Sequence, residues 1–120
     1  MKYMLMMFGD ATTMREERSP EWVRDMFAFM KSFNQEIAAS GELVAAEGLD
    51  LPSTAKTISL ADGQVTVTDG PFAEAKESLA GFWIWDVADE ARAIELAGRI
   101  VRWADRVELR PVPAGPPPEV

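Results

Sequence analysis

The spacing of hydrophobic residues predicts two long helices in this chain. Between residues 20 and 40, apolar side chains recur at intervals of three and four, as they do on one face of an α-helix. The members of this stripe are Trp22, Val23, Met26, Phe27, Met30, Phe33 and Ile37. Ser19 and Pro20 suit the helix start, because Ser accepts hydrogen bonds from free backbone amides and Pro fits the first helical position. Gly41 is typical of a helix end, and a second helix is predicted over residues 89 to about 105.

Short apolar or alternating segments predict six strands around these helices. They cover residues 2–8, 42–49, 55–60, 64–68, 82–87 and 107–112. The dipeptide Asp62-Gly63, between the third and fourth strands, is a strong signal for a tight hairpin turn. The resulting order, β-α-β-β-α-β with an extra hairpin strand, is the ferredoxin-like α+β arrangement. We therefore expect one domain over residues 1–112 and a Pro-rich tail over residues 113–120.

The sheet of such a fold has two faces, and two helices cover only one of them. An antiparallel sheet with one face in water normally alternates apolar and polar residues. Two strands do not alternate in this way, because Met4-Leu5-Met6-Met7-Phe8 and Phe82-Trp83-Ile84-Trp85 are apolar throughout. A Trp and its neighbours on an uncovered sheet face would form an exposed apolar patch of the size that marks a protein–protein interface. The pattern therefore predicts a homodimer in which two sheets pack face to face as a dimeric α+β barrel.

Composition narrows the chemistry that the chain can perform. With 120 residues, 48% of them hydrophobic and 27% charged, it has the make-up of one globular domain. It contains no Cys and no His, which excludes disulfides, thiolate catalysis and the usual ligands of zinc and copper. A site for a hard metal built from Asp and Glu oxygens stays open, although no carboxylate spacing of the calcium-loop kind is present. We expect no metal site and no cofactor.

Charge and hydropathy also bear on partners and location. The net charge is −8, and the 12 basic residues are scattered among 20 acidic ones rather than gathered in a band. We therefore expect no nucleic acid partner and no membrane partner. The apolar run of residues 3–8 is too short for a signal peptide, and no segment approaches transmembrane length. These features predict a cytoplasmic protein.

The densest polar cluster lies in residues 69–78, directly before the most apolar strand. Gly and Pro there indicate a turn, and a charged loop that leads into a buried strand is a common way to hold polar groups in a pocket. The connection over residues 9–19 is a second candidate, since it exceeds the usual length of about four to six residues. The candidate catalytic residues are Asp69 and Glu74. The candidate binding residues from the two segments are Asp10, Arg15, Gly70, Pro71, Phe72, Lys76 and Glu77.

Two sequence runs carry a resemblance to a known family. They are Asp69-Gly70-Pro71-Phe72-Ala73-Glu74-Ala75-Lys76-Glu77 and the Ala80-Gly81-Phe82 that follows. Together with Met1-Lys2-Tyr3-Met4-Leu5, Gly48-Leu49 and Arg110-Pro111, they resemble YCII-related proteins of the DGPF subgroup. The resemblance implies an uncharacterised bacterial protein with the dimeric α+β barrel fold, often encoded beside extracytoplasmic-function sigma factors. A His-Asp pair proposed as the catalytic site of the YCII branch cannot be carried over, because this chain has no His.

Three roles for the polar loop remain open. In the first, Asp69 or Glu74 acts as a general base on a small molecule, since burial raises a carboxyl pKa, and Lys76 stabilises developing negative charge. In the second, the loop is architectural: Asp69 caps a turn, Phe72 fills the core, and the charged side chains pair across the dimer. In the third, the protein is a non-catalytic module that binds a ligand or a protein for a regulatory partner.

Overall fold

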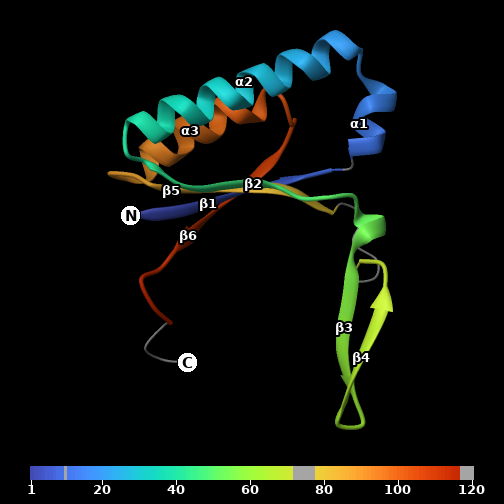
Figure 1. The fold of residues 1–120 in the computed structure, drawn as a ribbon. Helices are drawn as coiled ribbons and strands as arrows, with labels where there is room; N and C mark the ends of the chain where they lie inside the picture. Colours follow the sequence, from blue (N-terminus) through green and yellow to red (C-terminus); the bar gives the residue numbers. More distant parts are fainter. Residues whose placement is uncertain (10, 72–77, 117–120) are drawn as a thin grey trace.

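The computed structural model describes residues 1–9, 11–71 and 78–116, which form three helices, a short 3-10 turn and six strands (Figure 1). The helices are α1 (Ala11–Glu17), α2 (Pro20–Ala39) and α3 (Glu90–Val101), and the 3-10 turn is η1 (Pro52–Thr54). The strands are β1 (Lys2–Phe8), β2 (Leu43–Gly48), β3 (Lys56–Ala61), β4 (Gln64–Asp69), β5 (Leu79–Asp86) and β6 (Val107–Val112).

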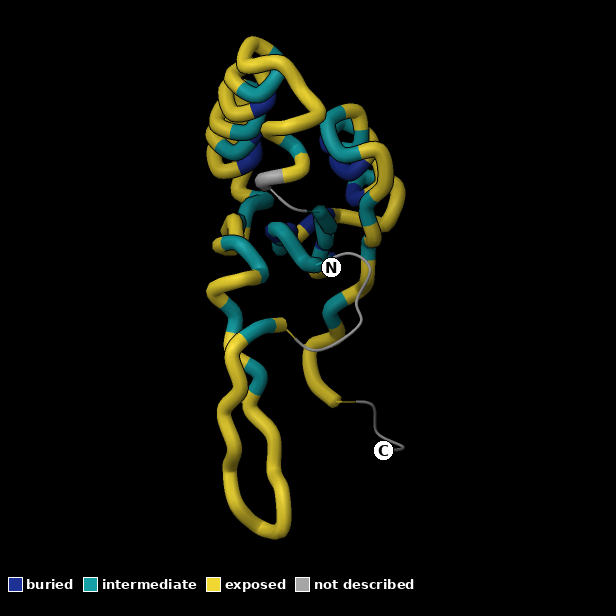
Figure 2. The backbone as a smooth tube through the Cα atoms, turned by 90° about the vertical axis from the view of Figure 1, so that its right-hand side faces the viewer, coloured by how far each residue is buried: buried dark blue, intermediate teal, exposed yellow. Residues whose placement is uncertain are grey.

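Four of the strands form one antiparallel sheet in the order β2-β5-β1-β6, with α2 and α3 on one face (Figure 1). This is the ferredoxin-like β-α-β-β-α-β arrangement that the sequence predicted, and the α+β class is confirmed. The extra hairpin differs from the expectation in one respect. Strands β3 and β4 pair only with each other, and they project away from the helices as a separate two-stranded sheet (Figures 1 and 2).

The predicted starts of the two long helices are confirmed, whereas the second helix ends at Val101 rather than near Asp105, because the chain turns after it and Asp105 takes a positive φ of 62°. The backbone amide of Trp22 donates to Ser19 Oγ at 3.1 Å, and that of Arg92 donates to Asp89 Oδ1 at 2.9 Å. Gly41 follows α2 with φ of +80°, a conformation that favours glycine. The segment 9–19, predicted as a loop, instead contains α1. With only seven residues, α1 is too short to produce a periodic apolar stripe, which is why the sequence pattern does not reveal it.

The hydrophobic core lies between the helices and the sheet. Strand register places Tyr3 opposite Trp85 and Leu5 opposite Trp83, and all four side chains point under the helices, where Leu5 and Trp85 are fully buried. The sequence raised the prospect of a Trp on the uncovered face. Both Trp side chains lie on the covered face instead, because residues two apart in a strand share a face.

The uncovered side of the sheet, here called the open face, carries the alternate residues of the same strands. Its apolar members are half-buried, and its charged members from β6 are exposed. The residues that define it are Met4, Met6, Phe82, Ile84, Glu108 and Arg110.

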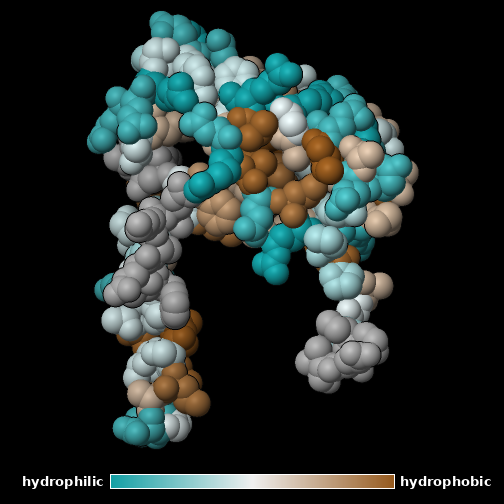
Figure 3. All heavy atoms as spheres, turned by 180° about the vertical axis from the view of Figure 1, so that it is seen from behind, coloured by the Kyte–Doolittle hydropathy of each residue, from teal (hydrophilic) through white to brown (hydrophobic). Residues whose placement is uncertain are grey.

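The β3–β4 hairpin, here called the arm, has two distinct sides. Ile58 faces Val67 and Leu60 faces Val65 on one side, where their exposed fractions are 67%, 63%, 72% and 70%. Figure 3 shows these hydrophobic residues gathered along one side of the arm. The other side is polar, with the hydroxyls of Ser59 and Thr66 hydrogen-bonded at 2.8 Å.

The hairpin turn that the sequence predicted is confirmed at the tip of the arm. Asp62 and Gly63 both have positive φ, of 51° and 77°. A two-residue turn with φ positive at both positions matches the twist of the paired strands.

Candidate functional site

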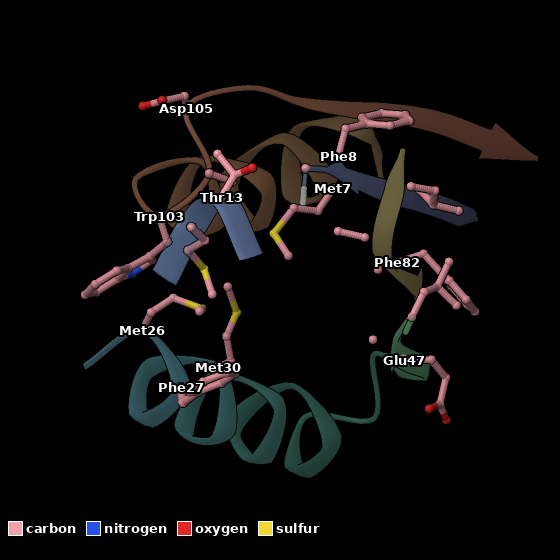
Figure 4. A pocket seen from close by; sticks show the side chains of 18 of the residues that line it. Met7, Phe8, Thr13, Met26, Phe27, Met30, Glu47, Phe82, Trp103 and Asp105 are labelled. Atoms are coloured by element: carbon pink, nitrogen blue, oxygen red, sulfur yellow. The ribbon is translucent and has the colours of Figure 1, made fainter. Parts of the chain in front are cut away.

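A cavity of about 860 Å³ lies between α1, α2 and the helix-covered face of the sheet (Figure 4). It is lined by the end of β1 with α1, residues 22–34 of α2, residues 46–52, the start of β5 and residues 103–106 after α3. This volume falls in the range of sites that hold small molecules and cofactors, roughly 300 to 1,000 Å³.

Methionine side chains occupy the centre of the cavity. Met7 comes from β1, whereas Met26 and Met30 come from α2, and their sulfur atoms point toward the open centre (Figure 4). Methionine is flexible and polarisable, and so a methionine-lined space can adapt to ligands of different shape. Met26 and Met30 belong to the apolar stripe of the predicted helix, and their three-and-four spacing gave no sign that part of this stripe faces a cavity.

Aromatic rings close one wall of the cavity. Trp103 packs against Trp22 with ring centroids 5.4 Å apart, and against Phe29 at 5.6 Å. The guanidinium of Arg18 lies 4.5 Å from the centre of the Trp22 ring, a cation–π contact. Because Arg18 and Trp22 both line the cavity, this wall presents aromatic surface with a positive charge beside it.

Polar residues also line the cavity, and they are Thr13, Glu17, Arg18, Asn34, Glu47, Asp50, Asp105 and Arg106. Asn34 Oδ1 accepts a hydrogen bond of 2.8 Å from the indole Nε1 of Trp83, which leaves the Asn34 side chain held at the lining. Glu47 turns its carboxylate away from the centre, and Asp105 also points outward (Figure 4). The side chains that Figure 4 shows pointing toward the centre are therefore those of the methionines, not these two carboxylates.

Two ion pairs outside the cavity bind the helices to each other and to the sheet. Arg92 of α3 donates through Nε and Nη2 to both carboxylate oxygens of Glu42, each at 2.9 Å. These hydrogen bonds, with a further one from Ser40, lower the pKa of Glu42 to about 2. Arg99 of α3 likewise hydrogen-bonds Glu36 of α2 and lowers its pKa. Their place between packed elements indicates a structural role.

The described members of the predicted site lie at the base of the arm and on α1. Asp69 ends β4, and its carboxylate, 85% exposed, forms an ion pair with Lys56. Gly70 has φ of +106°, donates to the carbonyl of Ala55 and accepts from the Thr57 hydroxyl, each at 2.8 Å.

Pro71 and Arg15 are exposed. Neither they nor Asp69 and Gly70 line the cavity. The remaining candidates lie outside the described residues; they are Asp10, Phe72, Glu74, Lys76 and Glu77.

The two segments that the sequence singled out meet beside the cavity. The amide of Gly9 donates to the carbonyl of Ser78 at 2.9 Å, so the start of segment 9–19 is joined to the end of segment 69–78. Gly9 and residues 79–81 line the cavity. Glycine is required at 81, because a Cβ there would lie 2.9 Å from the carbonyl oxygen of Glu47. The polar loop therefore ends at the cavity wall.

The described part of the chain has neither a membrane-spanning helix nor a metal-holding cluster of Asp and Glu side chains. None of its helices combines the length and the apolar character needed to cross a bilayer. Within the same residues, Asp and Glu side chains do not gather in groups of three or more that would hold a metal ion.

Two similarities to known proteins bear on this chain. An uncharacterized protein of Rhizobium meliloti is 29% identical to it over 100 residues, which cover 81% of this chain and 77% of that protein. The YCII-related domain matches residues 1–113, which is nearly the whole sequence. The expectation raised by the sequence runs quoted above is thereby confirmed at the level of the family, and the chain belongs to the YCII-related family.

Proposed function

We propose that this protein binds a small, largely apolar molecule in the cavity between α1, α2 and the sheet. The observation that carries the proposal is the methionine-lined centre of a cavity of about 860 Å³. Sites for small molecules are typically concave and mostly apolar, with a few polar groups that fix orientation. Asn34 and Arg18 supply such groups at the lining.

The arrangement favours a ligand with an apolar body and one polar end. The body fits against Met7, Met26 and Met30, because packing hydrocarbon against thioethers removes apolar surface from water, which is favourable. A hydrogen-bonding or anionic end fits beside Asn34 or Arg18, because the side-chain amide of Asn34 and the guanidinium of Arg18 can donate hydrogen bonds to it.

A neutral fluorescent probe tests the proposal without knowledge of the natural ligand. We expect N-phenyl-1-naphthylamine to bind saturably, with one probe per chain, and its emission to rise in the apolar site. Ala46→Leu should weaken this binding by about tenfold or more, because Ala46 lines the cavity and the larger side chain fills it.

The neighbouring position on the same strand provides the matched control. Ala45 lies outside the lining, so Ala45→Leu should leave the affinity for the probe unchanged. Equal affinity in the two variants, or the lack of saturable binding to the wild type, would count against a ligand site in this cavity.

We further propose that carboxylates of the polar loop act as acid and base on the bound molecule. Support comes from the Gly9–Ser78 hydrogen bond and from the cavity lining by residues 79–81, which bring the end of segment 69–78 to the cavity. In this proposal, Glu74 removes a proton from carbon next to a carbonyl and, in its protonated form, returns a proton to that carbon. A desolvated carboxylate is suited to this work, because burial raises its pKa.

Hydrogen–deuterium exchange measures this chemistry directly. Small ketones and lactones are incubated with the protein in D₂O, and loss of the C–H signal is followed by NMR. We expect catalysed exchange in the wild type and at least about a hundredfold loss in Glu74→Gln, the scale of general-base catalysis. Glu16→Gln, an exposed acid on α1, is the control and should retain the wild-type rate. Equal exchange in the wild type and in a protein-free sample would refute the catalytic proposal and leave the binding proposal intact.

The non-catalytic role, the regulatory partner and the cytoplasmic homodimer expected from the sequence remain proposals. A protein that binds without turnover would serve as a sensor for a regulatory partner, and the sigma-factor link implied by the DGPF resemblance belongs to this alternative. A cytoplasmic homodimer agrees with either activity.

A further inference from the structure

We infer that the methionines around the cavity are an oxidation site, and that their conversion to sulfoxides by a peroxide lowers the affinity for the ligand. Four of the chain's seven methionines line this one cavity; here called the cavity methionines, they are Met7, Met14, Met26 and Met30. The chain has no Cys, so thioether sulfur is its only sulfur open to an oxidant. The inference rests on the proposed binding function and adds a means of regulating the same site.

The cavity methionines are set apart from the packed core. Among the residues that the structure describes, the contiguous buried cluster between helices and sheet contains no methionine. Met7 and Met30 pack against this cluster from outside it. Of the other methionines, Met4 and Met6 belong to the open face. We therefore expect oxygen added at the cavity to leave the buried cluster, and with it the fold, intact.

The cavity is open to small oxidants in solution. Its lining includes exposed residues of α1 and of the turn that follows, namely Thr13, Glu17 and Arg18. Met26 is 6% exposed, and the other cavity methionines are half-buried. The sulfur atoms of Met7, Met26 and Met30 point into the open centre (Figure 4). A peroxide that enters the cavity therefore meets sulfur from both β1 and α2.

Oxidation converts each thioether into a polar group. A hydroperoxide transfers an oxygen atom to sulfur: its O–O bond breaks, an S–O bond forms, and sulfur gives up an electron pair. The peroxide is thereby reduced to water or to an alcohol. The product, methionine sulfoxide, is polar, whereas methionine is flexible and apolar. Methionine sulfoxide reductases reverse the change, so the modification is suited to regulation.

Sulfoxides in the lining disfavour an apolar ligand. A ligand that packs against a sulfoxide oxygen buries an acceptor without a donor, which costs free energy. Water is held at the oxygen instead, and the apolar surface against which the ligand body packs is lost. Because several cavity methionines share one space, their oxidation acts on the same bound molecule.

Peroxide treatment of the full chain, followed by titration with N-phenyl-1-naphthylamine, tests the inference. Catalase removes the remaining hydrogen peroxide, and peptide mass spectrometry gives the sulfoxide content at each methionine. We expect sulfoxide at the cavity methionines and an affinity for the probe lower by about tenfold or more. Circular dichroism should show the fold retained. Reductases for both sulfoxide epimers should then restore the affinity.

Matched variants assign the loss to the cavity. Leu has a volume similar to that of Met and carries no sulfur, so the cavity variant is Met7→Leu/Met14→Leu/Met26→Leu/Met30→Leu. Each protein is compared with itself before and after peroxide. The cavity variant should keep the affinity that it had before treatment. The control Met4→Leu/Met6→Leu, on the open face, should lose affinity by the same factor as the wild type.

Several outcomes would overturn the inference and leave the binding site standing. They are an unchanged affinity in wild-type protein that carries the cavity sulfoxides, cavity methionines that resist peroxide while Met4 and Met6 are oxidised, an equal loss in the cavity variant, and a loss that coincides with unfolding. If the cavity variant does not fold, the reductases decide, because failure to restore the wild-type affinity also overturns the inference. Lack of probe binding before peroxide would instead refute the proposed binding function, and this regulation with it.

Discussion

Side chains alternate between two faces in both strand β5 and the arm, but the apolar side is buried in β5 and exposed in the arm. In β5, Trp83 and Trp85 share one side and are buried under the helices, and Trp85 is wholly inaccessible. In the arm, Leu60 and its neighbours share one side with equal regularity, yet Leu60 is 72% exposed. Alternation defines which residues share a face. Whether a face is covered depends on what the rest of the chain, or another chain, places over it.

The largest expected effect comes from truncating one apolar side chain in the core under the helices and one in the arm. Phe33 on α2 is 1% exposed and packs edge-on against Trp85, with ring centroids 6.1 Å apart. Phe33→Ala should lower the free energy of unfolding by about 3 to 5 kcal/mol, because it removes contacts and leaves a cavity. Val67→Ala should cost less than about 1 kcal/mol in the separated chain, because Val67 is already exposed to water.

Urea unfolding at two protein concentrations separates the regions. If a second copy covers the arm, the cost of Val67→Ala rises with concentration while that of Phe33→Ala keeps its high value. If Val67→Ala lowers the free energy of unfolding as much as Phe33→Ala does in dilute protein, the chain itself covers the arm. The contrast between the arm and the core would then be wrong.

Local signals were readable in the sequence, whereas the placement of one element on another was not. Ser19 and Gly63 work through their own backbone neighbourhood, so the helix start and the hairpin turn could be predicted. Met30 and Phe33 belong to one predicted stripe, yet Phe33 is core and Met30 faces the cavity. That difference arises from where α1 lies, and α1 is too short for its pattern to be recognised.

The same reasoning applies to the candidate site. The polar loop was identified from its composition, and its connection to the cavity through Gly9 and Ser78 is a backbone contact between residues 69 positions apart. Pairings of this range depend on the folded sheet rather than on local sequence. The separate two-stranded sheet of the arm was missed for a related reason, since hairpin signals fix the pairing of β3 with β4 but not with the larger sheet.

A second prediction compares the two Trp side chains within the covered region. Trp83 is slightly more exposed than Trp85, yet its indole N–H donates to Asn34, whereas the buried indole N–H of Trp85 has no partner among the described residues. Substitution by Phe removes a satisfied donor from Trp83 and an unsatisfied one from Trp85. An unsatisfied buried donor costs about 1 to 3 kcal/mol.

Trp83→Phe is therefore expected to destabilise the protein by about 1 kcal/mol more than Trp85→Phe, the reverse of their order of burial. Thermal and urea unfolding of the two variants measure the difference. A larger loss for Trp85→Phe would show that ring volume under the helices outweighs the missing hydrogen bond.

The last comparison concerns one ion pair in each region. Glu42 is paired with Arg92 where β2 meets α3, and its pKa in the folded protein is about 2, below the usual 4.5. A lowered folded pKa stabilises the protein above the usual value, and that stability is lost as the pH falls toward 2. Glu42→Gln should therefore cost about 1 to 2 kcal/mol near neutral pH, after solvent screening of a partly exposed pair, and almost nothing near pH 2.

The ion pair of the arm provides the control. Asp69 is 85% exposed beside Lys56, and Asp69→Asn should change the free energy of unfolding by less than about 0.5 kcal/mol near neutral pH. Urea unfolding of both variants from pH 7 to about pH 2 gives the comparison. A cost of Glu42→Gln that stays constant below pH 4 would mean that the side chain contributes by packing rather than by charge. In that case the Glu42–Arg92 charge pair adds little to the covered region, which differs from the arm chiefly in its buried apolar contacts.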